Sequence, residues 1–327
     1  MSAAEPVSTA SRLPAPAGPA RVFEGEPGLF RERFNRKSFE YRHTLGNHPL
    51  FELPRIADLA MKLWGTGKGL VTMKSGDTSV AGGWTDMPGK SMSLVKAIRE
   101  LPESGAWLML KNVFLDPEYK ELMDQGYRDL AELAGLDVER DVSWPDAYIF
   151  IASPRSITPY HFDHESTFLM QIHGEKTYNI FDRAELTEEE IEQYYLGDLS
   201  SARYRDEAQS RAAVYHLRPG LGVHQPPRAP HWVRNGDEYS VSFSILSCLR
   251  AWDREAPVYQ VNHYLRSLGF SPTPPGRSAW RDGLKRAFVS SPARRHPQSK
   301  NDLLRAGVER VARPAAFLGR VLGRGPR

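Results

Sequence analysis

The chain has 327 residues, of which 40% are hydrophobic and 25% are charged, so it can bury a sizeable core without disulfide bonds. Its single cysteine, Cys248, cannot form an internal bridge, which excludes a disulfide-stabilised scaffold and favours a reducing compartment. The first residues lack the charged start and apolar stretch of a signal peptide, and no run of about 18 apolar residues occurs. We therefore expect a cytoplasmic protein without a transmembrane segment.

The net charge of +3 is unevenly distributed along the chain. Residues 276–327 contain thirteen Lys and Arg against three Asp and Glu, so this tail carries +10 and the remainder carries −7. A basic tail on an acidic body could contact nucleic acid, an anionic membrane surface or an acidic partner. The simpler alternative is a solvated, partly helical tail without a partner.

The first 145 residues predict a terminal segment and a flank. Residues 1–20 are rich in Ala, Pro and Ser, so ordering them would cost backbone entropy that burial cannot offset, and we expect them to be disordered. Residues 21–145 predict a mixed helical and β flank that packs on a core. Its clearest elements are a helix from Pro54 with Ile56, Leu59, Ala60 and Leu63 on one face, strands at 69–73 and 107–113, and a helix at 117–134.

The core is predicted at residues 146–250, where short β-rich runs are separated by Pro, Gly or charged turns. Many short strands of this kind indicate a sandwich or barrel. One helix is expected within it, at 186–196, with Thr187 as its N-cap. A C-terminal helix at 251–275 and the basic tail at 276–327 follow. The fold class is therefore mainly β with flanking helices (α+β).

Candidate metal ligands begin with His161-Phe162-Asp163, directly after a β-rich stretch. On an extended strand, side chains two positions apart point to the same face, so this imidazole and this carboxylate can reach one ion. Such a pair is weak on its own, because short motifs recur by chance.

Two later segments support the pair. Lys176 follows an apolar run and a turn at Gly174, and it is predicted to begin the strand that pairs back beside the strand of His161, with its ammonium inside a barrel. The alternative is an exposed strand lysine, since lysines are rarely buried unless paired. Residues 219–231 then predict a turn, a short strand and a proline-rich loop that ends at His231, the third candidate ligand.

These residues resemble the JmjC and cupin-like Fe(II)/2-oxoglutarate dioxygenases, especially the branch related to asparaginyl hydroxylases. The resemblance covers residues 146–249 and rests on three motifs in order. Thr158 to Asp163 is similar to the family's T-P-x-H-x-D, and Gln171 to Lys176 is similar to its Q-I-x-G-x-K. Gly220, Pro226 and His231 keep the spacing of its G-x5-P-x4-H.

The resemblance implies a double-stranded β-helix (jelly roll or cupin) core with helical elements at both ends. It implies that His161, Asp163 and His231 hold Fe(II), and that 2-oxoglutarate is the co-substrate. Its distal carboxylate would bind Lys176 and Thr158, and Ser244 would lie near its 1-carboxylate. The implied reaction is hydroxylation of a protein side chain or a small metabolite, coupled to formation of succinate and carbon dioxide.

Elementary chemistry is consistent with this assignment. Two imidazoles and one carboxylate suit Fe(II) and leave positions for a bidentate 2-oxo acid and oxygen, whereas structural zinc needs a fourth ligand. A carboxylate deep in an apolar barrel needs a cation, and a buried lysine becomes tolerable when it is paired.

The sequence also departs from the family pattern. Leu221 stands where relatives commonly carry an acid, and His224 stands where an aromatic or aliphatic residue is usual. His224 could line the pocket, compete as a ligand or be a satisfied structural group. His164 should point to the opposite strand face and have no metal role, and His173 should be exposed beside the turn.

Two other functions remain open at this point. One is a non-catalytic cupin-like binding or regulatory protein whose basic tail contacts nucleic acid, since a fold does not fix a function. The other is a cupin isomerase or hydrolase that uses the metal as a Lewis acid, with an additional ligand such as His224. No helix-turn-helix or zinc-finger pattern is present. The sequence identifies neither the primary substrate nor the oligomeric state, and a homodimer is possible.

Overall fold

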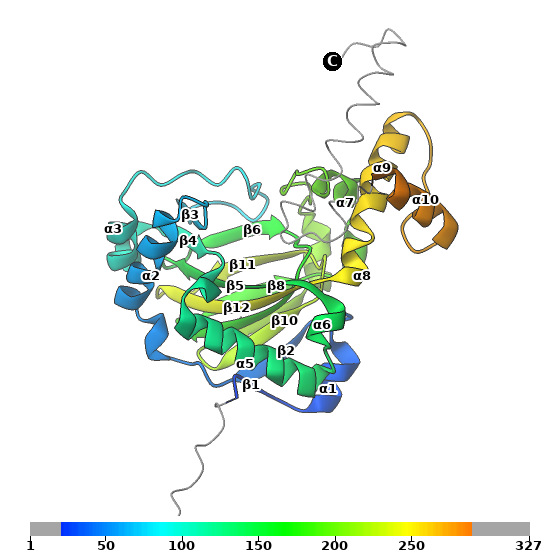
Figure 1. The fold of residues 1–327 in the computed structure, drawn as a ribbon. Helices are drawn as coiled ribbons and strands as arrows, with labels where there is room; N and C mark the ends of the chain where they lie inside the picture. The colour runs from blue at the N-terminus through cyan, green and yellow to red at the C-terminus, as the bar shows by residue number, and fades with distance from the viewer. Residues whose placement is uncertain (1–20, 290–327) are drawn as a thin grey trace, which may run out of the picture.

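The computed structural model describes residues 21–289, which form two facing β-sheets with helices around them (Figure 1). The larger sheet has eight strands in the order β1-β2-β10-β7-β12-β5-β4-β3, and the smaller has four in the order β6-β11-β8-β9. Neighbouring strands are antiparallel.

Eight strands make up the core, and the chain crosses repeatedly between the two sheets. Because β5, β7, β10 and β12 lie in one sheet and β6, β8, β9 and β11 in the other, the core is a double-stranded β-helix, as predicted. The core strands are β5 (Val142–Ala152), β6 (Ile157–His161), β7 (Ser166–His173), β8 (Lys176–Ile180), β9 (Ala213–Leu217), β10 (Leu221–Gln225), β11 (His231–Asn235) and β12 (Ser240–Leu249).

The N-terminal flank extends the larger sheet at both of its edges. β2 (Phe39–His43) pairs with β10 and carries β1 (Phe23–Glu24) outside it. On the other edge, β4 (Ala106–Leu110) pairs with β5 and carries β3 (Val71–Ser75). The flank thus packs on the core partly as strands continuous with its sheet.

The helices of the flank follow their sequence signals. α2 (Leu53–Gly65) buries Ile56, Leu59, Ala60 and Leu63, which is the face that the sequence predicts. α5 (Pro117–Ala134) begins after Asp116, whose carboxylate accepts the backbone N–H of Glu118, and ends at Gly135 with a φ of +72°. The other elements here are α1 (Pro27–Arg33), η1 (Pro49–Phe51), α3 (Leu94–Arg99), α4 (Leu101–Ser104), η2 (Val113–Leu115) and α6 (Val138–Asp141).

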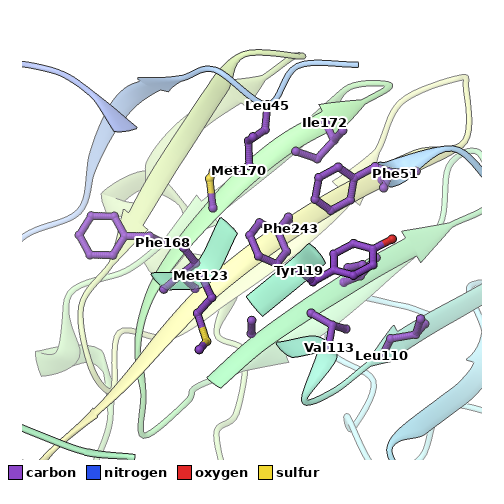
Figure 2. Packing of buried hydrophobic residues seen from close by; sticks show 14 of the residues in the cluster. Leu45, Phe51, Leu110, Val113, Tyr119, Met123, Phe168, Met170, Ile172 and Phe243 are labelled. Atoms are coloured by element: carbon purple, nitrogen blue, oxygen red, sulfur yellow. The ribbon is translucent and has the colours of Figure 1, made fainter. Parts of the chain in front are cut away.

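The two faces of the larger sheet have different roles. Outward side chains such as Phe168, Met170 and Phe243 pack with Tyr119 and Met123 of α5 in the main hydrophobic core (Figure 2). Inward side chains line a cavity between the sheets. Strand alternation separates the two sets, so the same strands supply both the core and the site.

Two regions of the described residues after β8 are helical, one before β9 and one after β12. The predicted helix at 186–196 is α7 (Glu188–Tyr194), where Thr187 and Glu190 form a capping box. The predicted helix at 251–275 is α8 (Arg250–Asp253) followed by α9 (Ala256–Ser267). α10 (Ala279–Val289) lies within the predicted basic tail and forms a hairpin with α9 at the opposite end of the sheets from α2 (Figure 1). Two further short turns are η3 (Arg183–Glu185) and η4 (Asp206–Arg211).

Some expectations fall outside residues 21–289: the disorder of residues 1–20 and the structure of the tail beyond Val289. Within the described part of the chain, none of the helices combines the length and the apolar character needed to cross a lipid bilayer.

One predicted pairing is wrong. Lys176 does begin a strand, but β8 pairs with β9 and β11, and β11 separates it from the strand of His161. β11 lies 55 positions after Lys176 in the chain, so its insertion between the two strands could not be inferred from the local pattern.

Gly174 sets the turn that leads into β8. Its φ is +69°, and a Cβ there would lie 2.2 Å from the carbonyl oxygen of Tyr239. We expect Gly174→Ala to lower the free energy of unfolding by about 2–4 kcal/mol, because backbone strain and a backbone clash add. Gly67→Ala is the matched control: its φ is +67° with open space around it, so only the strain remains. If urea denaturation gave the same loss of unfolding free energy for Gly174→Ala and Gly67→Ala, the contribution of the backbone clash would be contradicted.

Candidate metal centre

Three side chains converge at one end of the cavity. His161 ends β6, His231 begins β11, and the two are directly paired across the antiparallel ladder. Asp163 follows two residues after His161, and its Oδ2 lies 3.8 Å from Nε2 of each histidine. One ligand atom from each residue can be chosen so that all three lie within 4.8 Å of one another, so these residues could hold a metal ion.

The orientation of both imidazoles is fixed by hydrogen bonds to the backbone. Nδ1 of His161 lies 2.7 Å from the carbonyl oxygen of Pro159, and Nδ1 of His231 lies 3.2 Å from that of Ala229. Because a carbonyl only accepts, each Nδ1 must be the protonated nitrogen, and Nε2 carries the lone pair in the neutral ring. Both Nε2 atoms are the ones that face Asp163, as metal ligation requires.

Rings stacked on the histidines restrict them further. Trp84 stacks on His161 with ring centroids 4.9 Å apart, and Tyr178 stacks on His231 at 5.3 Å. Trp84 comes from the long connection between β3 and α3, far from the motifs in sequence. The sequence analysis missed it, and a tryptophan in a Gly-rich loop was the available signal.

Asp163 is delivered by a loop and not by the strand itself. β6 ends at His161, so the alternation argument for this pair holds only approximately. The backbone N–H of Arg228 donates to the carbonyl oxygen of Asp163 at 2.8 Å, and Arg228 lies three residues before His231. This bond joins the two loops that carry the candidate ligands.

Arg228 is itself fully buried, at 0% exposure. Its guanidinium lies over the rings of Tyr195, Trp252 and Tyr259 at 5.2, 4.8 and 5.0 Å, and it donates to Glu255 at 2.5 Å. Burial alone would lower the pKa of Arg228, but Tyr195 and Glu255 raise it above its ordinary value. The sequence analysis did not single out this residue, because its partners come from α7, α9 and the segments beside them.

The cavity between the sheets has a volume of about 530 Å³. Its inner end contains Lys176, which is paired in register with Asn235, four positions along β11 from His231. Four residues of β-strand span about 13 Å between Cα atoms, and the lysine side chain and the imidazole ring shorten that interval from either end. The cavity therefore places a cation opposite the candidate metal ligands.

Lys176 is 8% exposed, so the alternative of a solvent-facing lysine is excluded. Among residues 21–289, no carboxylate lies within ion-pair distance of its ammonium. Burial lowers the pKa of Lys176 from 10.5 to about 7. A buried ammonium without a counter-charge is costly, which is the situation expected of a site that binds an anion.

Polar groups beside Lys176 and the triad point to the same conclusion. Thr158 Oγ1 accepts the indole N–H of Trp107 at 3.1 Å, which leaves the hydroxyl hydrogen to donate into the cavity. Within the described part of the chain, several buried polar atoms that line the cavity have no hydrogen-bond partner: Thr167 Oγ1, Gln225 Nε2, Asn235 Oδ1 and Ser244 Oγ. Such atoms are normally satisfied in a native structure, so they indicate a polar ligand.

The cavity also contains an acid that the sequence analysis missed. Burial raises the pKa of Asp146 to about 7, against the opposing effect of the hydrogen bond from the backbone N–H of Ala147. Glu165, Lys68 and Lys111 line the same cavity. The lining is therefore polar as well as aromatic.

The remaining histidines do not join the site. His224 is fully buried outside the cavity lining; its Nδ1–H donates to the Thr167 carbonyl and its Nε2 accepts the backbone N–H of Asn35. Both nitrogens are used, which leaves no lone pair for an ion. His164 bonds Tyr195 through Nδ1 and Asp253 through Nε2, so both of its ring nitrogens have structural partners. His173 is half-buried against Tyr239, where the sequence predicted exposure.

Comparison with solved structures finds the Escherichia coli ribosomal oxygenase YcfD in several forms. One form has a TM-score of 0.49 and 16% identity, covering 89% of this chain and 68% of that one. Another has a TM-score of 0.47 and 15% identity over 81% of this chain and 65% of that one. A third, described as a complex with cobalt and 2-oxoglutarate, has a TM-score of 0.46 and 16% identity, with 91% and 69% covered.

The chain thus covers slightly less than two thirds of the YcfD chain in one of these structures and slightly more than two thirds in the other two. No protein-family profile matches the chain, and no curated protein sequence matches it. The chemistry of the site therefore rests on the site's own geometry.

Arg228 offers a test of how the two ligand loops are held. We expect Arg228→Ala to lower the free energy of unfolding by about 3–5 kcal/mol, because it leaves a cavity among three aromatic rings and removes the ion pair to Glu255. We also expect it to weaken Co(II) binding by roughly 10- to 100-fold, because residues behind the ligands set their geometry.

Arg205→Ala is the matched control, since Arg205 also bridges a carboxylate, that of Glu190, but its side chain is 41% exposed. Its Co(II) affinity should equal that of the parent protein in absorbance titrations. A Co(II) affinity that is unchanged in Arg228→Ala would show that Arg228 stabilises the fold without positioning the ligands.

Proposed function

We propose that this protein is an Fe(II)- and 2-oxoglutarate-dependent dioxygenase that hydroxylates a protein side chain or a small metabolite. The observation that carries the proposal is the placement of His161, Asp163 and His231 at one end of a cavity whose other end holds the buried ammonium of Lys176. A metal site with a fixed cation opposite it is what a chelating diacid co-substrate needs.

The donor set fits Fe(II). Two neutral imidazole nitrogens and one carboxylate oxygen match the facial ligand set of non-haem iron oxygenases. His224, the additional ligand that a Lewis-acid cupin would use, has both nitrogens bonded elsewhere. We therefore assign His161, Asp163 and His231 as the metal ligands.

The wall of the cavity fits 2-oxoglutarate. Lys176 would form an ion pair with the distal carboxylate, and the hydroxyl of Thr158 would donate to it. Ser244 is fully buried, and its hydroxyl has no partner among the residues that the structure describes, so it can bind the carboxylate next to the keto group. The co-substrate would thus satisfy groups that are otherwise costly to bury.

The bound metal and 2-oxo acid would supply the oxidising chemistry, and the protein would supply orientation and exclusion of water. The Nδ1–H bonds of His161 and His231 keep the lone pairs of both Nε2 atoms directed at the ion. Trp84 stacks on His161 and Tyr178 stacks on His231, and both imidazoles are buried, which limits the access of solvent to the two rings. The primary substrate would bind in the same cavity, whose lining also includes Asp146 and Glu165.

The non-catalytic alternative is less consistent with these contacts. A binding protein that used only the basic tail would gain nothing from an unpaired buried Lys176. The lone, buried Cys248 supports a reducing compartment, and we propose the cytoplasm as the location.

The experiment that tests the proposal is anaerobic titration of the protein with Fe(II) and 2-oxoglutarate. We expect a visible metal-to-ligand absorption band, followed by release of succinate when oxygen is admitted. Asp163→Ala should abolish both signals because the metal loses its carboxylate ligand, and Lys176→Ala should weaken 2-oxoglutarate binding by at least about 100-fold through loss of a buried ion pair. His173→Ala is the control with a histidine outside the site. A parent protein without the band would refute the function.

The lowered pKa of Lys176 also predicts how the stability of the protein without co-substrate depends on pH. Its pKa in the folded protein, about 7, lies below its ordinary 10.5, so the unfolded chain binds the proton more tightly. The resulting penalty is complete below about pH 7 and disappears as pH rises towards 10.5.

We therefore expect Lys176→Met to raise the Tm of the ligand-free protein, most strongly at or below pH 7 and negligibly only above about pH 11. The matched control is Lys37→Met, an exposed lysine whose substitution should leave Tm unchanged across this range. Addition of 2-oxoglutarate with Co(II) should stabilise the parent and not Lys176→Met. A gain in Tm that does not depend on pH would contradict burial of the charged form.

A further inference from the structure

The α9–α10 hairpin exposes a continuous apolar stripe. Trp280, Leu284 and Phe288 are 66%, 63% and 55% exposed, although they are among the largest apolar side chains of the protein. They are spaced four residues apart on α10, so they lie along one face of the helix. A face of this size and kind on a soluble domain usually marks an interaction site.

The exposed residues of α10 are not the side through which this helix packs on the protein, because α10 contacts α9 through its opposite face. Against α9 the helix buries Val289 and also Asp282, which is 5% exposed and accepts the backbone N–H of Gly276 at 2.8 Å. Lys285 donates to Asn262 at 2.6 Å on the same side. α10 therefore attaches through a face that includes its polar groups and presents its apolar groups to solvent, the reverse of an ordinary surface helix.

Two exposed arginines lie near the stripe in the chain, and more positive charge follows it in the sequence. Arg277 and Arg281 are exposed, and the guanidinium of Arg281 lies over the ring of Trp280 at 5.3 Å. In the sequence beyond Val289, residues 290–327 add nine Lys and Arg against two Asp and Glu. The partner of this face must therefore tolerate both apolar side chains and a high density of cations.

We propose that α10 docks on an anionic phospholipid surface, with Trp280, Leu284 and Phe288 at the boundary between headgroups and acyl chains and with Arg277 and Arg281 at the phosphates. Helices with an apolar Trp/Leu/Phe face bordered by basic residues bind membrane interfaces in this orientation. Each nearby cation adds attraction to anionic lipid. Nucleic acid would satisfy the charges, but its phosphate backbone offers no apolar medium to cover Leu284 and Phe288.

A second copy of the chain fits less well. If the stripe packed against the same stripe of a second copy, two copies of residues 276–327, each with a charge of +10, would come together. Their repulsion would oppose the burial of apolar surface. An anionic lipid surface attracts the same charges and also covers apolar side chains. It is therefore the partner favoured by both the apolar stripe and the positive charge.

The test is flotation of the full-length protein with vesicles, compared between pure phosphatidylcholine and equal parts of phosphatidylcholine and phosphatidylglycerol. We expect binding to the anionic vesicles alone, weakened by salt. The triple variant Trp280→Ser, Leu284→Ser, Phe288→Ser should lose at least about tenfold in partitioning through loss of apolar contact. Arg277→Glu with Arg281→Glu should lose about tenfold or more through charge.

Trp64→Ser is the matched control, because Trp64 is 60% exposed on α2, at the other end of the molecule (Figure 1). It should partition like the parent protein. Three results would overturn the proposal: a parent that ignores anionic vesicles, a triple variant that still binds them fully, or a parent dimer in light scattering that the triple variant converts to monomers. The last result would assign the stripe to an interface between copies. None of these readouts depends on oxygenase activity.

Discussion

The antiparallel pairing of β6 with β11 is the constraint on which the site depends. It sets His161 directly opposite His231, although seventy residues separate them in the chain. A shift of one residue would turn one imidazole away from the cavity, because side chains alternate between the faces of a strand. The register is held on its other side by β8, which pairs with β11 from Ile180 to Lys176. The same ladder therefore places the candidate metal ligands and the buried cation.

The loops at this end of the barrel are tied to the C-terminal helices. Arg228 holds the backbone of Asp163, and its side chain is enclosed by Trp252, Glu255 and Tyr259 of the C-terminal segment. The C-terminal elements thus contribute to the geometry of the centre without entering it. α9, which carries Tyr259, is also the helix on which α10 is mounted.

The cavity is maintained at a cost in stability. A core filled with aliphatic side chains would be more stable than one that buries Lys176 and leaves Ser244 Oγ, Thr167 Oγ1 and Asn235 Oδ1 without hydrogen-bond partners in the described part of the chain. The fold offsets this on the outer face of the same sheet, where β7 and β12 pack large apolar residues against α5 (Figure 2). Strand alternation allows one sheet to carry a compact core on one side and a ligand site on the other.

The sequence by itself determined the features that depend on local pattern. The α5 helix was predictable from Asp116, Pro117 and its apolar spacing, and α7 from its cap at Thr187. The likeness of three motifs to a known family suggested the double-stranded β-helix and the residues of the site. Their mutual geometry was suggested by that resemblance and not by the pattern of residues alone.

Only the tertiary structure decided features that join distant segments. It placed β11 between β6 and β8, enclosed Arg228 in aromatic rings, brought Trp84 onto His161 and gave both nitrogens of His224 structural partners. The physical reason is that spacing along a chain determines which face a side chain occupies. Which other segment meets that face depends on packing over the whole fold, to which local sequence contributes only a part.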